Sequence, residues 1–378
     1  MRDDDTPPES DRLGEHPHPR ETAILLGQSD AEQALLDAFM SGRMHHAWLL
    51  TGPKGIGKAT LAYRMARFVL RHGVPEVAAA AGATNLQTPM DHPVFRQVAA
   101  GSHPNILALR RPWDEKAKRF KTVLTVDEIR RTTGFFGMSA GAGGWRIGII
   151  DAADDMNRNA ENALLKILEE PPPQCLFFVI AHQPGRLLPT IRSRCRTLRL
   201  APLAAEDVAA VLDASDKIKA SEADRLAMAR LSEGSVGRAL SIADGGGLDL
   251  YRDIVALLME LPRLNIKNLH KLADKIARRG ADDAWTTGID LLGDWLQRLV
   301  RTGAGAPHQP EFVNGEAASM VRLAQSASLD RWVEVWEKIS QLVARAEALN
   351  TDRKIVVLNI FSMLESVAGS HAGQHQSA

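Results

Sequence analysis

The feature that most constrains this chain is a glycine-rich loop between two regular elements. Its residues are Gly52, Pro53, Lys54, Gly55, Ile56, Gly57, Lys58, Ala59 and Thr60. The apolar run 47–51 before it predicts a buried strand, and the amphipathic run 59–70 predicts a helix. Strand, glycine loop and helix in this order are typical of a phosphate-binding loop, in which backbone N–H groups surround phosphate oxygens and a lysine reaches the outer phosphates. All nine residues are therefore candidate nucleotide ligands.

One position of this loop departs from the motif. A Ser or Thr normally follows the lysine, because its hydroxyl binds Mg²⁺, but Ala59 has no hydroxyl. Thr60 lies about 100° further round the helix, where it is better placed for a phosphate oxygen than for the metal. The sequence thus predicts that ATP or ADP can bind, with Mg²⁺ held only weakly.

A second apolar run, 145–151, ends in Asp151. In a parallel sheet, this position places a carboxylate beside a magnesium-bound phosphate, so Asp151 is the candidate on the metal side. An enzyme that hydrolyses ATP next needs a carboxylate to activate water, yet Ala152 and Ala153 follow. Asp154 comes three residues later, and we interpret it as the N-cap of the helix expected over 157–170. The pattern favours binding without hydrolysis.

The rest of the first half alternates strands and helices. Further strands are expected at 106–109 and 176–181, and a further helix at 29–39. This alternation predicts an α/β fold, with a parallel sheet covered by helices. After Pro202 the strand patterns cease.

Beyond that point the sequence predicts helices only. They are expected at 204–214, 222–232 and after Gly234, and then at 251–261, 289–300, 329–348 and 354–367. The glycines at 245–247 separate the two groups. The predicted divisions are a disordered tail at 1–18, a P-loop domain at 19–201, a helical lid at 202–243, an all-helical domain at 248–368 and a disordered tail at 369–378. Segment 72–87 stays undecided between loop and weak helix.

Composition restricts the partners and the cellular compartment that we expect for the protein. Forty-six basic residues balance forty-six acidic ones, so no overall charge attracts the chain to nucleic acid or to a membrane. The chain opens without a basic segment followed by an apolar one, and we expect a cytoplasmic protein. Cys175 and Cys195 alone cannot form a disulfide framework or a four-thiolate zinc site.

Four stretches resemble the clamp-loader subunits of bacterial DNA polymerase III, over roughly residues 20–240. They are 46–53, 151–157, 162–172 and 193–195. The chain is most similar to members in which the Asp-Glu pair of the motor subunits is commonly Asp-Ala, as in Asp151-Ala152. The resemblance implies an AAA+ domain, a helical lid, and a helical collar domain that joins five subunits in a ring. The implied partners are the gamma or tau motor subunits, the delta subunit, the sliding clamp and primer-template DNA, without a membrane.

The resemblance also implies roles for single residues. Arg194, in Ser193-Arg194-Cys195, would be an arginine finger that reaches the ATP of the adjacent motor subunit, although a structural basic residue is the alternative. Arg238 would stand on the phosphate side of this chain's own site, or be a solvated helix residue if that site is empty. His182 takes the place of a small polar residue of the motor subunits, which disfavours hydrolysis.

Two further comparisons with the family concern metal and DNA. Many relatives carry a four-cysteine module where this chain has residues 72–103, which contain no cysteine, and His92 and His103 are too few to replace it. We therefore expect no zinc. Basic residues gather between Arg110 and Arg131; a solvated surface explains them, and contact with DNA phosphates is the alternative.

Two other functions stay open. The chain could be an active AAA+ ATPase, with Thr60 and Asp154 standing in for the missing groups. It could also be a P-loop kinase that acts on a small molecule, but such an enzyme has no evident use for the long helical C-terminal part.

Overall fold

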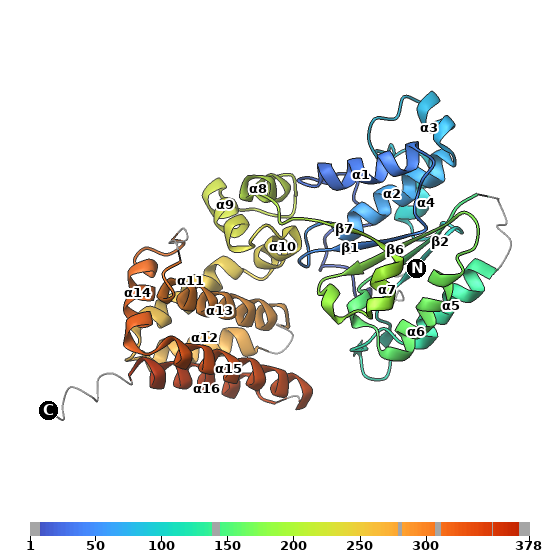
Figure 1. Cartoon of the computed structure of the whole chain (residues 1–378). Helices are drawn as coiled ribbons and strands as arrows, with labels where there is room; N and C mark the ends of the chain where they lie inside the picture. Colours follow the sequence, from blue (N-terminus) through green and yellow to red (C-terminus); the bar gives the residue numbers. More distant parts are fainter. Residues whose placement is uncertain (1–7, 138–143, 279–281, 307–310, 350, 370–378) are drawn as a thin grey trace. The chain divides into compact units, whose positions relative to one another are not determined.

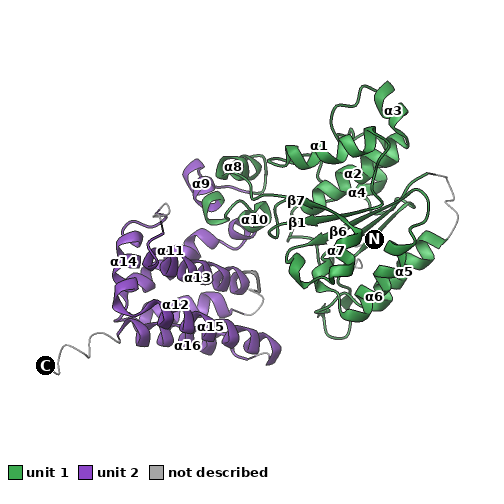
Figure 2. Cartoon of the chain, viewed as in Figure 1, with its two compact units in different colours: residues 1–217, 229–240 green, residues 218–228, 241–378 purple. Residues whose placement is uncertain are grey.

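A computed structural model describes residues 8–137, 144–278, 282–306, 311–349 and 351–369 of the chain. The chain divides into two compact units (Figure 2). Unit 1 comprises residues 1–217 and 229–240, and unit 2 comprises residues 218–228 and 241–378.

Unit 1 is built on one parallel sheet. Its strands are β1 (Ala47–Thr51), β2 (Ile106–Leu109), β5 (Arg146–Ile150), β6 (Cys175–Ala181) and β7 (Arg196–Arg199). They lie in the order β2-β5-β6-β1-β7, and all neighbours are parallel. Parallel neighbours need crossovers, which the helices supply, so the predicted α/β class is confirmed. The strand β7 was not predicted, because its residues form no apolar run.

Helices cover both faces of the sheet (Figure 1). On one face lie α1 (Ser29–Met40) and α2 (Lys58–His72). The other face carries α5 (Val126–Gly137), α6 (Arg158–Glu169) and α7 (Pro189–Arg194). Of these helices, α2, α5, α6 and α7 lie between consecutive strands of the sheet and supply the crossovers that parallel strands need.

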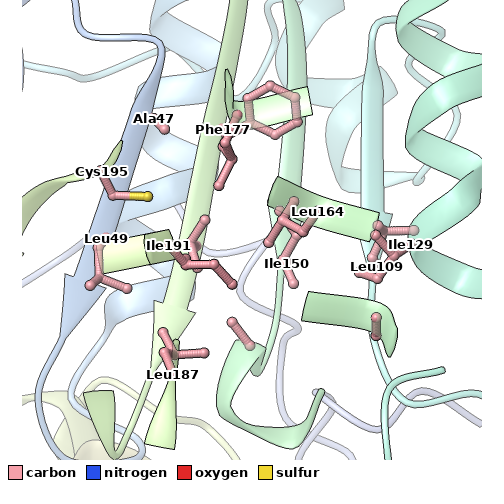
Figure 3. Close-up of a cluster of buried hydrophobic side chains, with 14 of the residues drawn as sticks. Ala47, Leu49, Leu109, Ile129, Ile150, Leu164, Phe177, Leu187, Ile191 and Cys195 are labelled. Atoms are coloured by element: carbon pink, nitrogen blue, oxygen red, sulfur yellow. The ribbon is translucent and has the colours of Figure 1, made fainter. Parts of the chain in front are cut away.

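Strand β6 contributes to the apolar core on one face of the sheet. All seven of its residues are buried, as expected of a central strand. Phe177 and Val179 belong to an apolar cluster that also contains Leu164 of α6 and Ile191 of α7. Figure 3 shows this cluster, with Ile191 close to Leu49 of β1. Both cysteines lie in this apolar cluster, and burial raises the pKa of Cys175 to about 11 and of Cys195 to about 12. These thiols stay protonated and unreactive at neutral pH.

The undecided segment 72–87 contains one short helix, α3 (Pro75–Ala80), and a second short helix, α4 (Pro93–Ala99), follows it. Each begins at a proline, a residue whose fixed φ suits the first turn. A small hairpin of β3 (Trp113–Asp114) and β4 (Arg119–Phe120) follows β2, and its two aromatic rings meet edge to face.

The N-terminal segment differs from expectation. We predicted disorder for residues 1–18, but residues 8–18 pack onto unit 1; residues 1–7 lie outside the described residues, as do 370–378. His18 is fully buried, with its Nε2 3.0 Å from Asp11 Oδ2 and its ring edge-on to Tyr63. Arg110 pairs with Asp11 at 3.2 Å. The acidic composition of this segment suggested a solvated tail. Composition alone does not reveal that basic partners about 100 residues away bind these acids.

Three helices follow β7. They are α8 (Ala205–Asp213), α9 (Glu222–Leu231) and α10 (Val236–Asp244). The boundary between the two compact units falls within α9, so the lid domain at 202–243 stays a prediction.

Unit 2 is helical throughout its described residues. Its elements are α11 (Gly247–Glu260), α12 (Ile266–Ala277), α13 (Asp282–Gly303), α14 (Glu316–Ser326), α15 (Leu329–Leu349) and α16 (Arg353–Ala368). Trp285, Trp295 and Trp332 are almost fully buried, so these aromatic residues form its core. The sequence did not predict α12 and α14. Within the described ranges of the chain, no helix is long and apolar enough to cross a membrane.

Candidate nucleotide-binding site

The glycine-rich loop joins the carboxyl end of β1 to the first turn of α2. Gly52, Gly55 and Gly57 have φ values of 136°, 79° and 99°, which residues with a side chain rarely adopt. Gly57 is the N-cap of α2, and no side chain caps that helix start. The first N–H groups of α2 are therefore open to an anion, and the loop fits a phosphate.

Lys58, the lysine of the motif, is folded back onto its own loop. Its Nζ donates hydrogen bonds to the carbonyl oxygens of Gly52, at 2.7 Å, and of Pro53. Burial lowers the pKa of Lys58 to about 8, although Asp151 and Asp154 oppose this shift. Lys58 is thus mainly charged at pH 7, and a bound nucleotide has to replace these carbonyl partners with phosphate oxygens.

The start of α10 lies directly against the loop. The N–H of Gly237 donates to the carbonyl of Gly55 at 3.0 Å, and Ser235 Oγ donates to the carbonyl of Lys54 at 2.8 Å. Ser235 Oγ also accepts from the N–H of Arg238 at 3.2 Å. The structure therefore brings the helix of Arg238 next to the phosphate loop, and the Arg238 side chain is half-buried there.

Asp151 directly follows β5, at the same edge of the sheet as the loop. Its side chain is half-buried, and burial raises the pKa of Asp151 to about 7 with help from the negative charge of Asp11. Ala152 and Ala153 follow, and neither carries a group that could activate water.

Asp154 has a different role from the one we predicted. It lies in the short 3₁₀ helix η2 (Ala153–Asp155) and accepts hydrogen bonds from the backbone N–H groups of His182 and Gln183, the latter at 2.8 Å. The N-cap of α6 is Asn157, whose side chain accepts from the N–H of Ala160. Our N-cap interpretation was wrong because the chain makes an extra turn before α6. Nothing in the sequence pattern points to this link with the end of β6.

His182 donates its backbone N–H to the carboxylate of Asp154. It is half-buried, and burial lowers its pKa to about 4, with the positive charge of Lys58 acting in the same direction. His182 is therefore neutral at pH 7.

The metal side of the site is poor in ligands. Ala59 offers no oxygen, and burial raises the pKa of Asp151 to about 7, so that a proton competes with a metal ion for this carboxyl near neutral pH. A magnesium ion would rest mainly on phosphate oxygens. For zinc, we find no group of three or more His, Cys, Asp or Glu side chains that could hold a metal, within the residues that the structure places.

Arg194 lies at the opposite edge of the sheet. It ends α7 two residues before β7, and β7 runs parallel to β1 with Arg196 beside Trp48. The loop follows the other end of β1, about 13 Å away at 3.3 Å per residue. The side chain of Arg194 is about one-third exposed. The backbone of Arg194 therefore lies toward the end of β1 that is remote from the chain's own phosphate loop.

The basic residues between 110 and 131 are partly neutralised within unit 1. Arg111 pairs with Asp155 at 3.2 Å, and Arg130 and Arg131 pair with acids three residues before them on α5. Lys116, Arg119 and Lys121 are exposed on or beside the β3–β4 hairpin. The structure thus favours a largely solvated surface.

The parallel sheet, with the phosphate loop after a strand that has neighbours on both sides, defines a P-loop α/β domain. Residues 27–204 match the family model described as "DNA polymerase III, delta subunit". Over this segment the chain is similar to that family, and among its members to the delta-prime subunit of DNA polymerase III.

Two delta-prime subunits carry this similarity. The chain is 41% identical over 165 residues to the delta-prime subunit of Pseudomonas aeruginosa, which covers 43% of this chain and 46% of that protein. It is 33% identical over 219 residues to the delta-prime subunit of Escherichia coli, covering 56% and 59%. The matches thus span about half the length of these relatives. A solved gamma-subunit-related protein of Thermotoga maritima aligns over 88% of this chain and 99% of its own, with a TM-score of 0.40 and 15% identity.

Proposed function

We propose that this chain acts in DNA replication as a delta-prime-type subunit of the DNA polymerase III clamp loader, helping to load the sliding clamp onto primed DNA. Its partners would be the gamma or tau motor subunits and a delta subunit in a five-membered ring, in the cytoplasm. The similarity to delta-prime subunits over residues 27–204 supports this function. The helices of unit 2 would supply the collar.

Within this complex, the chain binds ATP or ADP without hydrolysing it. Binding without hydrolysis is supported by a phosphate loop that is open to an anion in a site that lacks two groups needed for hydrolysis. Gly57 leaves the start of α2 uncapped, whereas Ala59 and Ala152 replace the metal hydroxyl and the base that activates water. Lys58, Thr60, Asp151 and Arg238 are the side chains that we assign to nucleotide binding, with Mg²⁺ weakly held.

The proposed catalytic contribution of the chain is Arg194, acting on the ATP of a neighbouring motor subunit. Its place at the edge of the sheet away from its own loop supports a role between subunits. A guanidinium in such a position stabilises the charge on the transferred phosphoryl group, and losing it costs about 10³–10⁵ in rate in the best-studied cases.

The alternative of an active ATPase is less well supported. It needs Asp154 to activate water, but that buried carboxylate already accepts from the N–H groups of His182 and Gln183. A small-molecule kinase would leave the helices of unit 2 without a function.

The test is ATP hydrolysis by the complex reconstituted with primed DNA and clamp. Arg194→Ala should reduce turnover strongly, whereas Arg192→Ala, an exposed arginine of the same helix, should leave it within about two-fold. Unchanged turnover with Arg194→Ala would remove the finger. Failure of the chain to assemble with the other subunits would remove the clamp-loader function itself.

A further inference from the structure

We infer that Glu169 is a positioning residue for Arg194: its carboxylate holds the guanidinium in the orientation in which it serves the neighbouring subunit. The inference rests on the proposed function of Arg194 and adds a second residue to it. Arg194 Nη2 lies 2.8 Å from Glu169 Oε1, and Nη1 donates to the carbonyl of Thr190 at 3.0 Å.

Both partners stand at the ends of firmly packed helices. Glu169 is the last residue of α6, and Leu168 before it is buried and offers its carbonyl to His46 Nε2 at 3.2 Å. Arg194 is the last residue of α7, between the buried side chains of Ile191 and Cys195. The ion pair therefore joins two points of the backbone that are fixed by the same apolar core.

The stability of α6 does not require this glutamate. A carboxylate at a helix C-terminus meets the negative end of the helix dipole, which is unfavourable. Pro171, Pro172 and Pro173 already end the helix. Glu169 is thus a costly residue for the helix alone, and its contact with Arg194 is what offsets the cost.

The contact leaves the arginine able to act. A guanidinium has five N–H donors, and the two contacts use two of them, so three remain. Its charge also persists, because arginine does not lose its proton in proteins. A free arginine side chain would lose about 2 kcal/mol of rotamer entropy on being fixed, and prior orientation by Glu169 and Thr190 reduces that loss at the moment of catalysis.

The test uses the reconstituted complex with primed DNA and clamp, and measures kcat and KM for ATP. Glu169→Ala should lower kcat about two- to five-fold with KM unchanged, which corresponds to about 0.4–1 kcal/mol, the range of an exposed ion pair. Glu169→Gln keeps an oxygen acceptor and should recover part of the loss. Glu170→Ala, which removes the same charge one position later, is the matched control and should behave as wild type.

A double variant separates positioning from a general structural effect. Glu169→Ala should cost nothing further when Arg194 is already alanine, because Glu169 acts only through that side chain. Additive losses, an effect equal to that of Glu170→Ala, or a rise in turnover with Glu169→Ala would each overturn the inference. If Arg194→Ala leaves ATP turnover unchanged, the proposed arginine finger fails. If Arg194→Ala abolishes turnover but Glu169→Ala leaves it unchanged, the finger stands and only the positioning role of Glu169 fails.

Discussion

Lys58 Nζ donates a hydrogen bond to the carbonyl oxygen of Gly52 at 2.7 Å. The lysine that is expected to contact phosphate is therefore hydrogen-bonded to its own loop. The same loop is bonded to the start of α10 through Gly55 and Gly237. The proposed binding of a nucleotide would therefore exchange internal hydrogen bonds for phosphate contacts, which would limit its net free energy.

The close contact of Gly55 with α10 predicts a strong effect of a single methyl group. A Cβ on Gly55 would lie 2.4 Å from Ser235 Oγ and 3.0 Å from Gly237 Cα, at a φ of 79°. Gly55→Ala should lower the free energy of unfolding by about 2–4 kcal/mol, from crowding and backbone strain together. Urea unfolding followed by circular dichroism measures this.

Gly42 provides the matched control for Gly55. Its φ is 67°, but no atom lies within 4 Å of an added Cβ. Gly42→Ala should therefore cost only the strain, about 1–2 kcal/mol. Equal losses for the two variants would show that the contact between loop and α10 contributes little.

Asp151 should make stability depend on pH in a defined direction. Its pKa is raised from 3.8 to about 7 in the folded protein, so between about pH 4 and pH 7 the native state binds more protons than the unfolded state. Stability from this group is complete at low pH and falls as pH rises through 7. His182 acts oppositely, because its pKa is lowered from 6.5 to about 4 and its contribution grows over about pH 4–6.5.

The variant Asp151→Asn separates the two slopes. We expect its stability relative to wild type to increase by about 1 kcal/mol between pH 5 and pH 7, since the half-buried side chain no longer has to ionise. Urea midpoints at both pH values measure the change. A difference that is constant or decreases with pH would show that the pKa of Asp151 is not raised in the folded protein.

The missing hydroxyl at Ala59 predicts a gain of magnesium dependence. Ala59→Thr should tighten ATP binding about three- to ten-fold with Mg²⁺ and leave it unchanged in excess EDTA, because the added oxygen supplies the absent metal ligand. Thr60→Ala should weaken binding equally in both conditions, since we assign Thr60 to phosphate. Titration of a fluorescent ATP analogue gives both values, and equal tightening by Ala59→Thr in EDTA would contradict the assignment.

The core of unit 2 contains a buried ion pair whose loss should be severe. Arg298 Nη1 lies 2.9 Å from Glu316 Oε1, Glu316 is fully buried, and the hydroxyl of Tyr251 contacts both. Glu316→Ala should destabilise the protein by about 3–5 kcal/mol, because it leaves a buried guanidinium uncompensated.

The exposed pair of Arg252 and Asp249 on α11 is the control for this ion pair. Asp249→Ala should cost no more than about 1 kcal/mol. A loss below about 1 kcal/mol for Glu316→Ala as well would mean that the buried pair is dispensable.

Much of the fold could be predicted from hydrophobic periodicity. Strand β1 was predicted with its observed bounds, and α2 and α6 within two residues, because their apolar spacing is clear and glycines or prolines mark their ends. The edge strand β7 escaped because only its backbone, paired with β1, makes it a strand. The packing of residues 8–18 escaped because it depends on partners distant in sequence.

The candidate site divides in the same way. Its glycine loop and Asp151 follow local patterns, so their places after two strands of the sheet could be predicted from the sequence. The bond from Asp154 to the N–H of Gln183 and the pair of Glu169 with Arg194 join different helices and strands, and only the three-dimensional arrangement reveals them.

We propose above all that the chain keeps a phosphate loop but cannot hydrolyse ATP. The most direct measurement is steady-state ATP turnover by the purified full chain with Mg²⁺, alone and with primed DNA added. We predict no turnover above that of a Lys58→Ala variant prepared in parallel. Sustained turnover that disappears with Lys58→Ala would contradict the claim and assign the chain to the active ATPases of its class.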